Sequence, residues 1–227
     1  MSRFFRDFTE AQHEIRRELA ERSIEVHPET MQDKIVADNI DYLTKEVQNF
    51  QYTVTQPNTI DLTPWVTQPW ADHEFGERIS CAGMNPGRAY MYRPEVWNEF
   101  IEDDGKFAYS YPERIGTHLE MVINELQIHP NSRQLFVAIW DRRTDPARRG
   151  LRRVPCSLGY HYLYRQGRLD VTYMMRSCDF ATHWANDVYL ARRTQEYVAQ
   201  RAGLQPGLFS QMIFSLHVYA KDVAEVF

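Results

Sequence analysis

The stretch VPCSLGYHYLYRQGRLDVTYMMRSCDFATHWAND, residues 154–187, decides the fold. Two runs within it, 157–166 and 168–177, carry Tyr, Leu and Val at the density typical of strands. Gly167 lies between these runs, and a glycine there favours a tight turn at Gln166-Gly167. The sequence therefore predicts a β-hairpin.

Outside the hairpin, helical patterns and apolar runs follow one another along the chain. We expect helices over 3–22, 31–50, 113–128 and 185–202, a short helix beginning at Pro94, and a strand over 208–219. Residues 135–140 form a compact apolar run. Residues 51–93, rich in Pro, Thr, Gln and Gly, are predicted to be irregular. Early helices and later strands, with a helix between strands, indicate an α+β or mixed α/β fold. No convincing linker divides the chain, so we expect a single domain over 1–227.

Composition limits the class of protein. The chain has 227 residues, of which 43% are hydrophobic and 13% aromatic, which argues against disorder and predicts a sizeable core. Three cysteines are too few for a disulfide scaffold. A charged N-terminus and the lack of a long apolar run argue against a signal peptide or membrane span, so we expect a cytoplasmic protein. The net charge of -5 argues against a role in coating nucleic acid.

Cys156 and Arg176 are the first candidates for chemistry. Cys156 follows a proline at the entrance of a strand; a free Cys in such a place is often only a buried core residue, but it can also be a nucleophile. Six arginines lie at 142, 143, 148, 149, 152 and 153; we expect most to be solvated and one or two to bias the thiol or an anionic ligand. Arg176 and Ser177 suit phosphate binding, and one hairpin would bring them to the sheet end where Cys156 lies.

Several short motifs resemble those of the thymidylate synthase superfamily in order and spacing. They are Pro155-Cys156, Arg176-Ser177-Cys178-Asp179, Asn186-Asp187, His217-Val218-Tyr219, Asn131-Ser132-Arg133, Val96-Trp97-Asn98-Glu99-Phe100, Asp104-Gly105 with Tyr111, and Lys45-Glu46-Val47, which resembles the family's HELLW helix. The resemblance covers about residues 40–220. It implies a thymidylate synthase-like fold, a mixed twisted sheet packed with helices that dimerises through the sheet.

Asp187 decides which base the resemblance implies. Thymidylate synthases carry Asn at this position, whose amide donates to uracil O4 and accepts from N3–H. A carboxylate can accept from cytosine N4–H and from a protonated N3, but an ionised one cannot donate to O4. Asp at this position, together with residues 175–179, 186–187 and 215–219, is similar to the phage deoxycytidylate hydroxymethylases. The structural alternative is that Asp187 only caps the helix over 185–202.

The resemblance implies a covalent reaction in which Cys156 adds to C6 of the pyrimidine. The one-carbon unit would come from 5,10-methylenetetrahydrofolate, and no metal is implied. Water would add to the resulting C5 methylene in a hydroxymethylase, whereas a synthase reduces it with hydride. The implied product is therefore a 5-hydroxymethyl derivative of dCMP or CMP.

Roles for the other residues follow from the same resemblance. Glu46 would relay protons near the base, Tyr111 would assist proton loss at C5, Trp97 and Asp179 would hold the folate, Arg176, Ser177 and Arg133 would bind the phosphate, and His217 and Tyr219 would bind the sugar 3′-hydroxyl. The family's equivalent of Arg133 reaches across a two-fold axis, so a homodimer is implied. Each of these side chains also has an ordinary reading as a core, capping or surface residue.

The sequence departs from the family pattern at several positions. Gln134 stands where a second Arg is usual, and His183 replaces a glycine close to the substrates. The N-terminal Arg-Thr-Gly phosphate loop is not found, and His27 and Lys34 are weak substitutes. The chain continues for only eight residues after Tyr219, so we expect no C-terminal segment to close over folate, which favours entry of water.

Two other functions stay open. A dUMP hydroxymethylase or a thymidylate synthase-type methylase would turn over dUMP better than dCMP. A homologue that binds nucleotide or RNA without catalysis would bind without turnover. The intact nucleophile, phosphate and sugar positions favour an enzyme over the second alternative.

Overall fold

The predicted hairpin lies at the centre of the structure, a computed structural model that describes residues 3–32, 34–148 and 153–227. Its strands, β7 (Ser157–Arg165) and β8 (Arg168–Asp179), pair in antiparallel fashion. Gln166 and Gly167 turn between them with φ angles of 50° and 79°. Two successive positive φ angles are those of a type I′ turn, whose twist matches that of the flanking strands.

The hairpin belongs to a seven-stranded sheet with the order β1-β5-β9-β8-β7-β6, in which β2 also pairs with β5. The other strands are β1 (Arg3–Phe5), β2 (Ile24–Val26), β5 (Thr44–Val54), β6 (Phe136–Ala138) and β9 (Gln205–Tyr219). Strand β9 runs parallel to β8 because helix α5 (Trp184–Arg201) returns the chain between them. It runs antiparallel to β5, and this mixed sheet confirms the predicted α+β (α/β) fold class.

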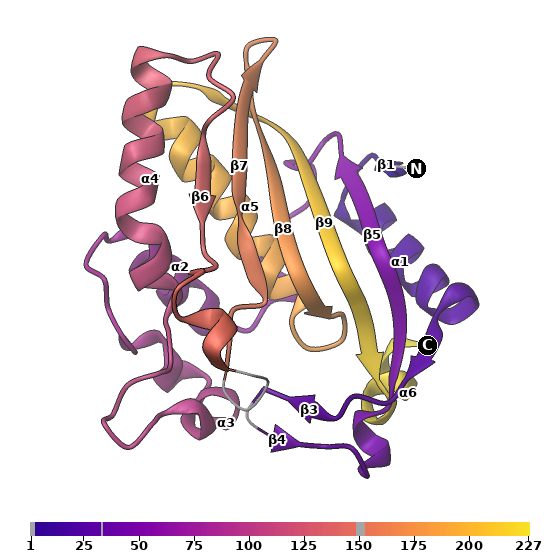
Figure 1. Cartoon of the computed structure of the whole chain (residues 1–227). Helices are drawn as coiled ribbons and strands as arrows, with labels where there is room; N and C mark the ends of the chain where they lie inside the picture. The colour runs from indigo at the N-terminus through magenta and orange to yellow at the C-terminus, as the bar shows by residue number, and fades with distance from the viewer. Residues whose placement is uncertain (1–2, 33, 149–152) are drawn as a thin grey trace.

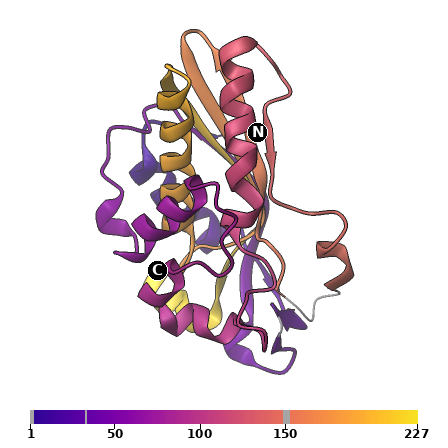
Figure 2. The same ribbon diagram turned by 90° about the vertical axis from the view of Figure 1, so that its left-hand side faces the viewer.

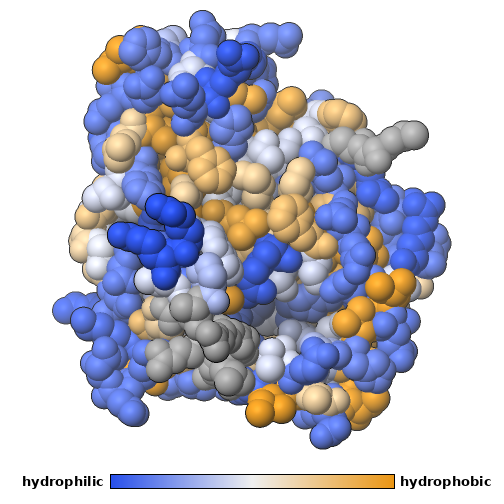
Figure 3. All heavy atoms as spheres, in the orientation of Figure 1, coloured by the Kyte–Doolittle hydropathy of each residue, from blue (hydrophilic) through white to orange (hydrophobic). Residues whose placement is uncertain are grey.

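The longer helices lie on one face of this sheet (Figures 1 and 2). They are α1 (Phe8–Arg22), α2 (Trp70–Ile79), α4 (Tyr111–Ile128) and α5, and the core fills the space between them and the strands. The opposite face carries exposed apolar side chains, among them Phe136 on β6 and Leu208 and Phe214 on β9. Figure 3 shows apolar surface across the middle of this face.

Short elements complete the described chain. They are β3 (Thr30–Met31), β4 (Lys34–Ile35), η1 (Ile40–Tyr42), η2 (Thr63–Trp65), η3 (Ala89–Tyr92), α3 (Pro94–Trp97), η4 (Asn98–Phe100), η5 (Asp145–Arg148), η6 (Ala220–Asp222) and α6 (Val223–Val226). The β3–β4 pair, α3, η4 and η6 gather near the end of the sheet where β8 and β9 terminate, at the bottom of Figure 1.

Helix α4 begins with a capping box that fixes its first residue. The Ser110 hydroxyl accepts from the Glu113 amide at 3.3 Å, and the Glu113 carboxylate accepts from the Ser110 amide at 3.0 Å. Both partners satisfy backbone N–H groups that a helix start leaves unpaired. Tyr111 is therefore held at the first position of the helix, next to the end of the sheet.

The helix predicted over 31–50 is wrong. This segment forms β3, β4, η1 and the first half of β5, and Glu46 lies on a strand. The helical spacing of its apolar residues was misleading, because Phe50, Tyr52 and Val54 alternate into the core and pair with β9 along the whole of β5. The match of Lys45-Glu46-Val47 to a family helix fails with it.

Other boundaries differ less. Helix α1 begins at Phe8 rather than at residue 3, since Asp7 accepts from the Thr9 and Glu10 amides and caps it. The segment 51–93 is not irregular throughout, because β5 extends into it and α2 lies within it. Among the described residues, no helix is both long and apolar enough to cross a membrane.

Candidate active site

A cavity of about 580 Å³ opens at the end of the sheet where β8 and β9 terminate and where β7 and α5 begin. Its wall contains ten of the predicted site residues: Glu46, Trp97, Tyr111, Cys156, Arg176, Ser177, Asp179, Asp187, His217 and Tyr219. The remaining one, Arg133, is exposed and lies outside this wall. Residues from seven parts of the sequence thus meet in one place, although the role of each stays a prediction.

Cys156 lies beside the guanidinium of Arg176. The Nη2 atom of Arg176 donates to the Cys156 sulfur at 3.8 Å. Its Nε and Nη2 atoms also donate to the carbonyls of Pro155 at 2.8 Å and Val154 at 3.2 Å, which hold the guanidinium in place. Arg176 thereby places a fixed positive charge beside the sulfur.

Gln32, the residue after β3, contacts the same sulfur. Gln32 donates from Nε2 to the Cys156 sulfur at 3.9 Å, and its Oε1 is buried without a hydrogen-bond partner among the described residues. Lys34 also lines the cavity and forms an ion pair with Glu99 at 2.6 Å. His27, the other weak substitute for the family's phosphate loop, is exposed and lies outside the cavity wall. No motif pointed to Gln32.

Asp187 lies in the first turn of α5, where its side chain points back toward the start of the helix. Burial raises the pKa of Asp187 to about 7, while the positive charges of Arg78 and Arg93 act in the opposite direction. No described residue donates a hydrogen bond to its carboxyl group. Asp187 therefore does not cap the helix through its side chain, and its carboxyl group is available to a ligand and can hold a proton near neutral pH.

Arg78, which is buried, and Glu74, which is partly exposed, form an ion pair on α2 behind Tyr111. Nε of Arg78 donates to Glu74 at 2.8 Å, and the guanidinium carbon lies 4.2 Å from the centre of the Tyr111 ring. Burial raises the pKa of Tyr111, and negative charge on Cys156 and Asp187 raises it further. Tyr111 therefore lies near enough to Cys156 and Asp187 for their charges to affect its hydroxyl group. Sequence reasoning missed Arg78 because its segment was predicted to be irregular.

The β5–β9 strand pair forms the wall that includes His217 and Tyr219. These two side chains project from the same face of β9, with ring centres 5.1 Å apart. Burial lowers the pKa of His217, which favours the neutral imidazole. Glu46 lies opposite His217 across the strand pair and accepts from the Ser215 hydroxyl at 2.5 Å. Glu46 is therefore held beside the strand residues predicted to bind the sugar.

Asp179, His183 and Trp97 lie elsewhere along the cavity wall. One oxygen of Asp179 accepts from the amides of Ala181 at 3.1 Å and Thr182 at 3.4 Å, so this residue does cap the turn before α5. Burial lowers the pKa of His183 to about 4, against the opposing effect of Asp179, and leaves the imidazole neutral. The indole N–H of Trp97 is buried without a described partner.

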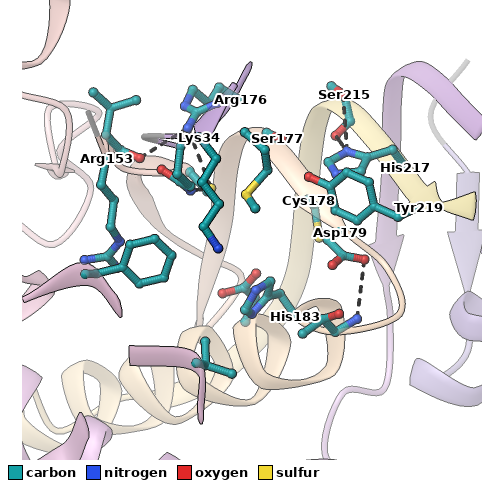
Figure 4. Close-up of a pocket in the computed structure, with 18 of the residues that line it drawn as sticks. Lys34, Arg153, Arg176, Ser177, Cys178, Asp179, His183, Ser215, His217 and Tyr219 are labelled. Carbon is teal, nitrogen blue, oxygen red and sulfur yellow. Dashed lines mark hydrogen bonds between the residues drawn. The ribbon is translucent and has the colours of Figure 1, made fainter. Parts of the chain in front are cut away.

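The arginine-rich segment behaves in two ways. Arg142 and Arg143 are exposed, as expected, whereas Arg149 and Arg152 lie outside the described residues. Arg153 differs from these two, because it is only 7% exposed and lines the cavity, and the prediction left room for one or two such arginines. Figure 4 shows Arg153 across the cavity from His217 and Tyr219.

Comparison with known proteins places this arrangement in a family. The family model for thymidylate synthase matches residues 36–227. The chain belongs to the thymidylate synthase family. A thermostable thymidylate synthase A from Bacillus subtilis has the same fold, with a TM-score of 0.78 over 97% of this chain and 82% of that chain, at 18% identity.

Archaeal sequences are similar to this thymidylate synthase family member over part of their length. A putative thymidylate synthase of Methanosarcina acetivorans is 31% identical over 61% of this chain and 70% of the relative. One from Methanosarcina mazei is 29% identical over 72% of this chain and 74% of the relative. Two further archaeal relatives are each matched over 57% of their length. These names support the family and leave the substrate open.

Proposed function

We propose that this family member is a pyrimidine nucleotide 5-hydroxymethyltransferase that converts dCMP or CMP with 5,10-methylenetetrahydrofolate. The observation that carries the proposal is the Asp187 carboxyl group, which accepts no hydrogen bond from described residues and lies on the same cavity wall as Cys156. Burial raises its pKa to about 7, so the group can both accept from an amino group and supply a proton.

This carboxyl group matches the Watson–Crick edge of cytosine. In its protonated form, Asp187 donates to N3 and accepts from the N4 amino group. When the Cys156 thiolate bonds to C6, the electron pair of the C5–C6 double bond moves toward C5 and N3, and the Asp187 proton can neutralise N3. An uncharged amide at the same place could donate a hydrogen bond to O4 of uracil but could not deliver that proton.

The other cavity residues position the reacting groups. Arg176 and Ser177 would hold the phosphate, His217 and Tyr219 the sugar hydroxyl, and Tyr111 would assist loss of the C5 proton. Glu74 positions Arg78, which supports Tyr111. Glu46 would act from the sugar side of the cavity, through Ser215, rather than from a helix beneath the base.

The cavity also fits the folate, which supplies the one-carbon unit at C5 when bound. Trp97 provides an aromatic wall, and its indole N–H has no partner among described residues. The second carboxylate oxygen of Asp179 accepts no hydrogen bond from described residues and would accept from the amino edge of the pterin.

We propose water addition, rather than hydride transfer, as the last step, because the segments around Asp187 resemble cytidylate hydroxymethylases. Incubation with tetrahydrofolate and formaldehyde should convert CMP or dCMP to a product that is about 30 Da heavier by mass spectrometry, because the reaction adds one CH₂O unit. UMP and dUMP should react much more slowly. Faster turnover of dUMP would identify the uridylate alternative, and nucleotide binding without turnover would identify a non-catalytic homologue.

A homodimer is part of the proposal. The sheet face opposite the helices carries the exposed side chains Phe136, Leu208 and Phe214, and a second copy of the chain could cover it. Arg133 is exposed, and its carbonyl oxygen lies 3.1 Å from Nε2 of His161 on β7 of the same sheet. Across a two-fold axis, Arg133 would complete the phosphate site of the partner.

Mixing two inactive variants tests this shared site. Arg133→Ala and Cys156→Ser should each be inactive or nearly so as homodimers. After subunit exchange at equal amounts, the mixed dimers should hold one complete site each and restore about a quarter of wild-type specific activity. No recovery, although exchange is verified by mass spectrometry, would show that Arg133 does not act in the partner.

A further inference from the structure

Arg153 occupies an unusual environment in the cavity wall. Its guanidinium carbon lies 4.5 Å from the ring centre of Tyr109, 4.7 Å from Trp97, 5.1 Å from Phe100 and 5.4 Å from Phe107. Nη1 donates one long hydrogen bond, 3.5 Å, to the Tyr109 carbonyl. No described residue forms an ion pair with it. Arg153 is therefore a buried cation supported by aromatic rings instead of by a carboxylate.

Packing alone does not account for this choice of residue. Cation–π contacts stabilise such a group by about 0.5–2 kcal/mol each, but an apolar side chain would fill the same space without desolvating a charge. Arg153 also lines the cavity, where a ligand can reach its side chain, and none of its nitrogens is among the described buried atoms without a partner. Arg93 contrasts with it, because Nη1 of Arg93 is buried without a described partner.

Arg153 lies away from the residues on β9 that are predicted to bind the nucleotide sugar. It lies on the opposite side of the cavity from Ser215, His217 and Tyr219, with Arg176 and Ser177 between (Figure 4). It packs on Trp97, the predicted folate-lining residue, and its charge is one of the causes that lower the pKa of His183. Arg153 thus lines the half of the cavity that the nucleotide would leave open.

We propose that Arg153 is a positioning residue for the one-carbon donor and binds the carbonyl oxygen of its pterin ring. This inference rests on the proposed function. A pterin presents a carbonyl acceptor beside a ring N–H and an amino group, as guanine does, and arginine is the usual partner of the guanine carbonyl. Asp179 would accept from the N–H and amino edge while Arg153 donates to the carbonyl. The two side chains together would select this donor and acceptor pattern.

Arg153→Leu and Arg153→Lys test this assignment, with Arg142→Leu as the matched control on an exposed arginine of the same segment. We expect Arg153→Leu to raise the KM for methylenetetrahydrofolate about tenfold or more, because one charged hydrogen-bond partner is lost. The KM for the nucleotide and the tritium release from C5 without folate should change less than about twofold. Arg153→Lys should give an intermediate KM for folate, since lysine keeps the charge but not the planar fork.

Calorimetry provides a readout that does not depend on turnover. Tetrahydrofolate should bind the nucleotide complex of the wild-type protein, and Arg153→Leu should weaken this binding about tenfold. A raised nucleotide KM would overturn the proposal in favour of a phosphate role, and unchanged folate affinity in folded Arg153→Lys and Arg153→Leu would reduce Arg153 to a packing residue. If tetrahydrofolate binds through Arg153 but no nucleotide is converted, the proposed reaction fails while this inference stands.

Discussion

Cys156→Ser is expected to lower kcat by about 10⁴-fold or more, because serine cannot supply the thiolate that bonds to C6. Nucleotide affinity should change little. Arg176 is held by the carbonyls of Val154 and Pro155, so its guanidinium stays in place when the sulfur is replaced. Rapid-quench turnover and calorimetry with dCMP and CMP would measure the two effects separately.

Cys81→Ser is the matched control for that experiment. Cys81 is a free thiol that donates to the Gly116 carbonyl at 3.2 Å and lies outside the cavity wall. Burial raises the pKa of Cys178, the third cysteine, well above its usual value, so this thiol should not substitute as nucleophile. Full activity of Cys156→Ser, or equal losses in both variants, would exclude the proposed covalent step.

Asp187→Asn should reverse the preference between bases. An amide cannot transfer a proton to N3, so kcat for cytidylate should fall by roughly 10²-fold or more, the usual range for loss of a general acid. The amide can donate to O4 of uracil and accept from N3–H, so activity on dUMP or UMP should rise relative to the wild type. The ratio of kcat/KM for the two bases is the quantity to compare.

The pH profile provides a second signature of Asp187. Because the pKa of Asp187 is raised to about 7, its carboxyl group carries the required proton below that pH and loses it above. Cytidylate turnover by the wild type should therefore fall by up to about tenfold per pH unit above pH 7. Asp187→Asn should lack this alkaline loss, since an amide does not titrate.

Glu95→Gln is a suitable control for both measurements, since it removes a carboxylate from the cavity rim, where the side chain is 68% exposed. Its base preference and pH profile should remain those of the wild type. A wild-type profile in Asp187→Asn, or retained cytidine preference, would mean that another group reads the base.

The hairpin, α5 and β9 could be predicted because their signals are local. Gln166 and Gly167 mark a turn that both φ angles bear out, and α5 has a regular apolar stripe that ends before Gly203. The motif spacing predicted that Cys156, Arg176 and Asp187 lie close together. All three line one cavity, because each lies near the end of an element that belongs to the sheet or packs on it.

The β5 strand and the α2 pair could not be predicted in the same way. The residues that fix β5, Phe50 and Tyr52, reveal a strand only through pairing with β9, which lies far along the chain. Arg78 and Arg153 have no sequence motif, and their burial depends on rings contributed by distant segments such as Tyr111 and Trp97. Long-range packing therefore set the parts of the site that the motifs missed.

The most direct test of the central claim is covalent trapping with 5-fluorinated nucleotides. Fluorine at C5 cannot be lost as a proton is, so the reaction should stop after Cys156 has bonded to C6 and the one-carbon unit has reached C5. With methylenetetrahydrofolate and 5-fluoro-dCMP or 5-fluoro-CMP, intact-protein mass spectrometry should find an adduct of nucleotide plus folate that maps to Cys156 and forms faster than with 5-fluoro-dUMP. An adduct with the uracil nucleotide alone, or none at Cys156, would contradict the account.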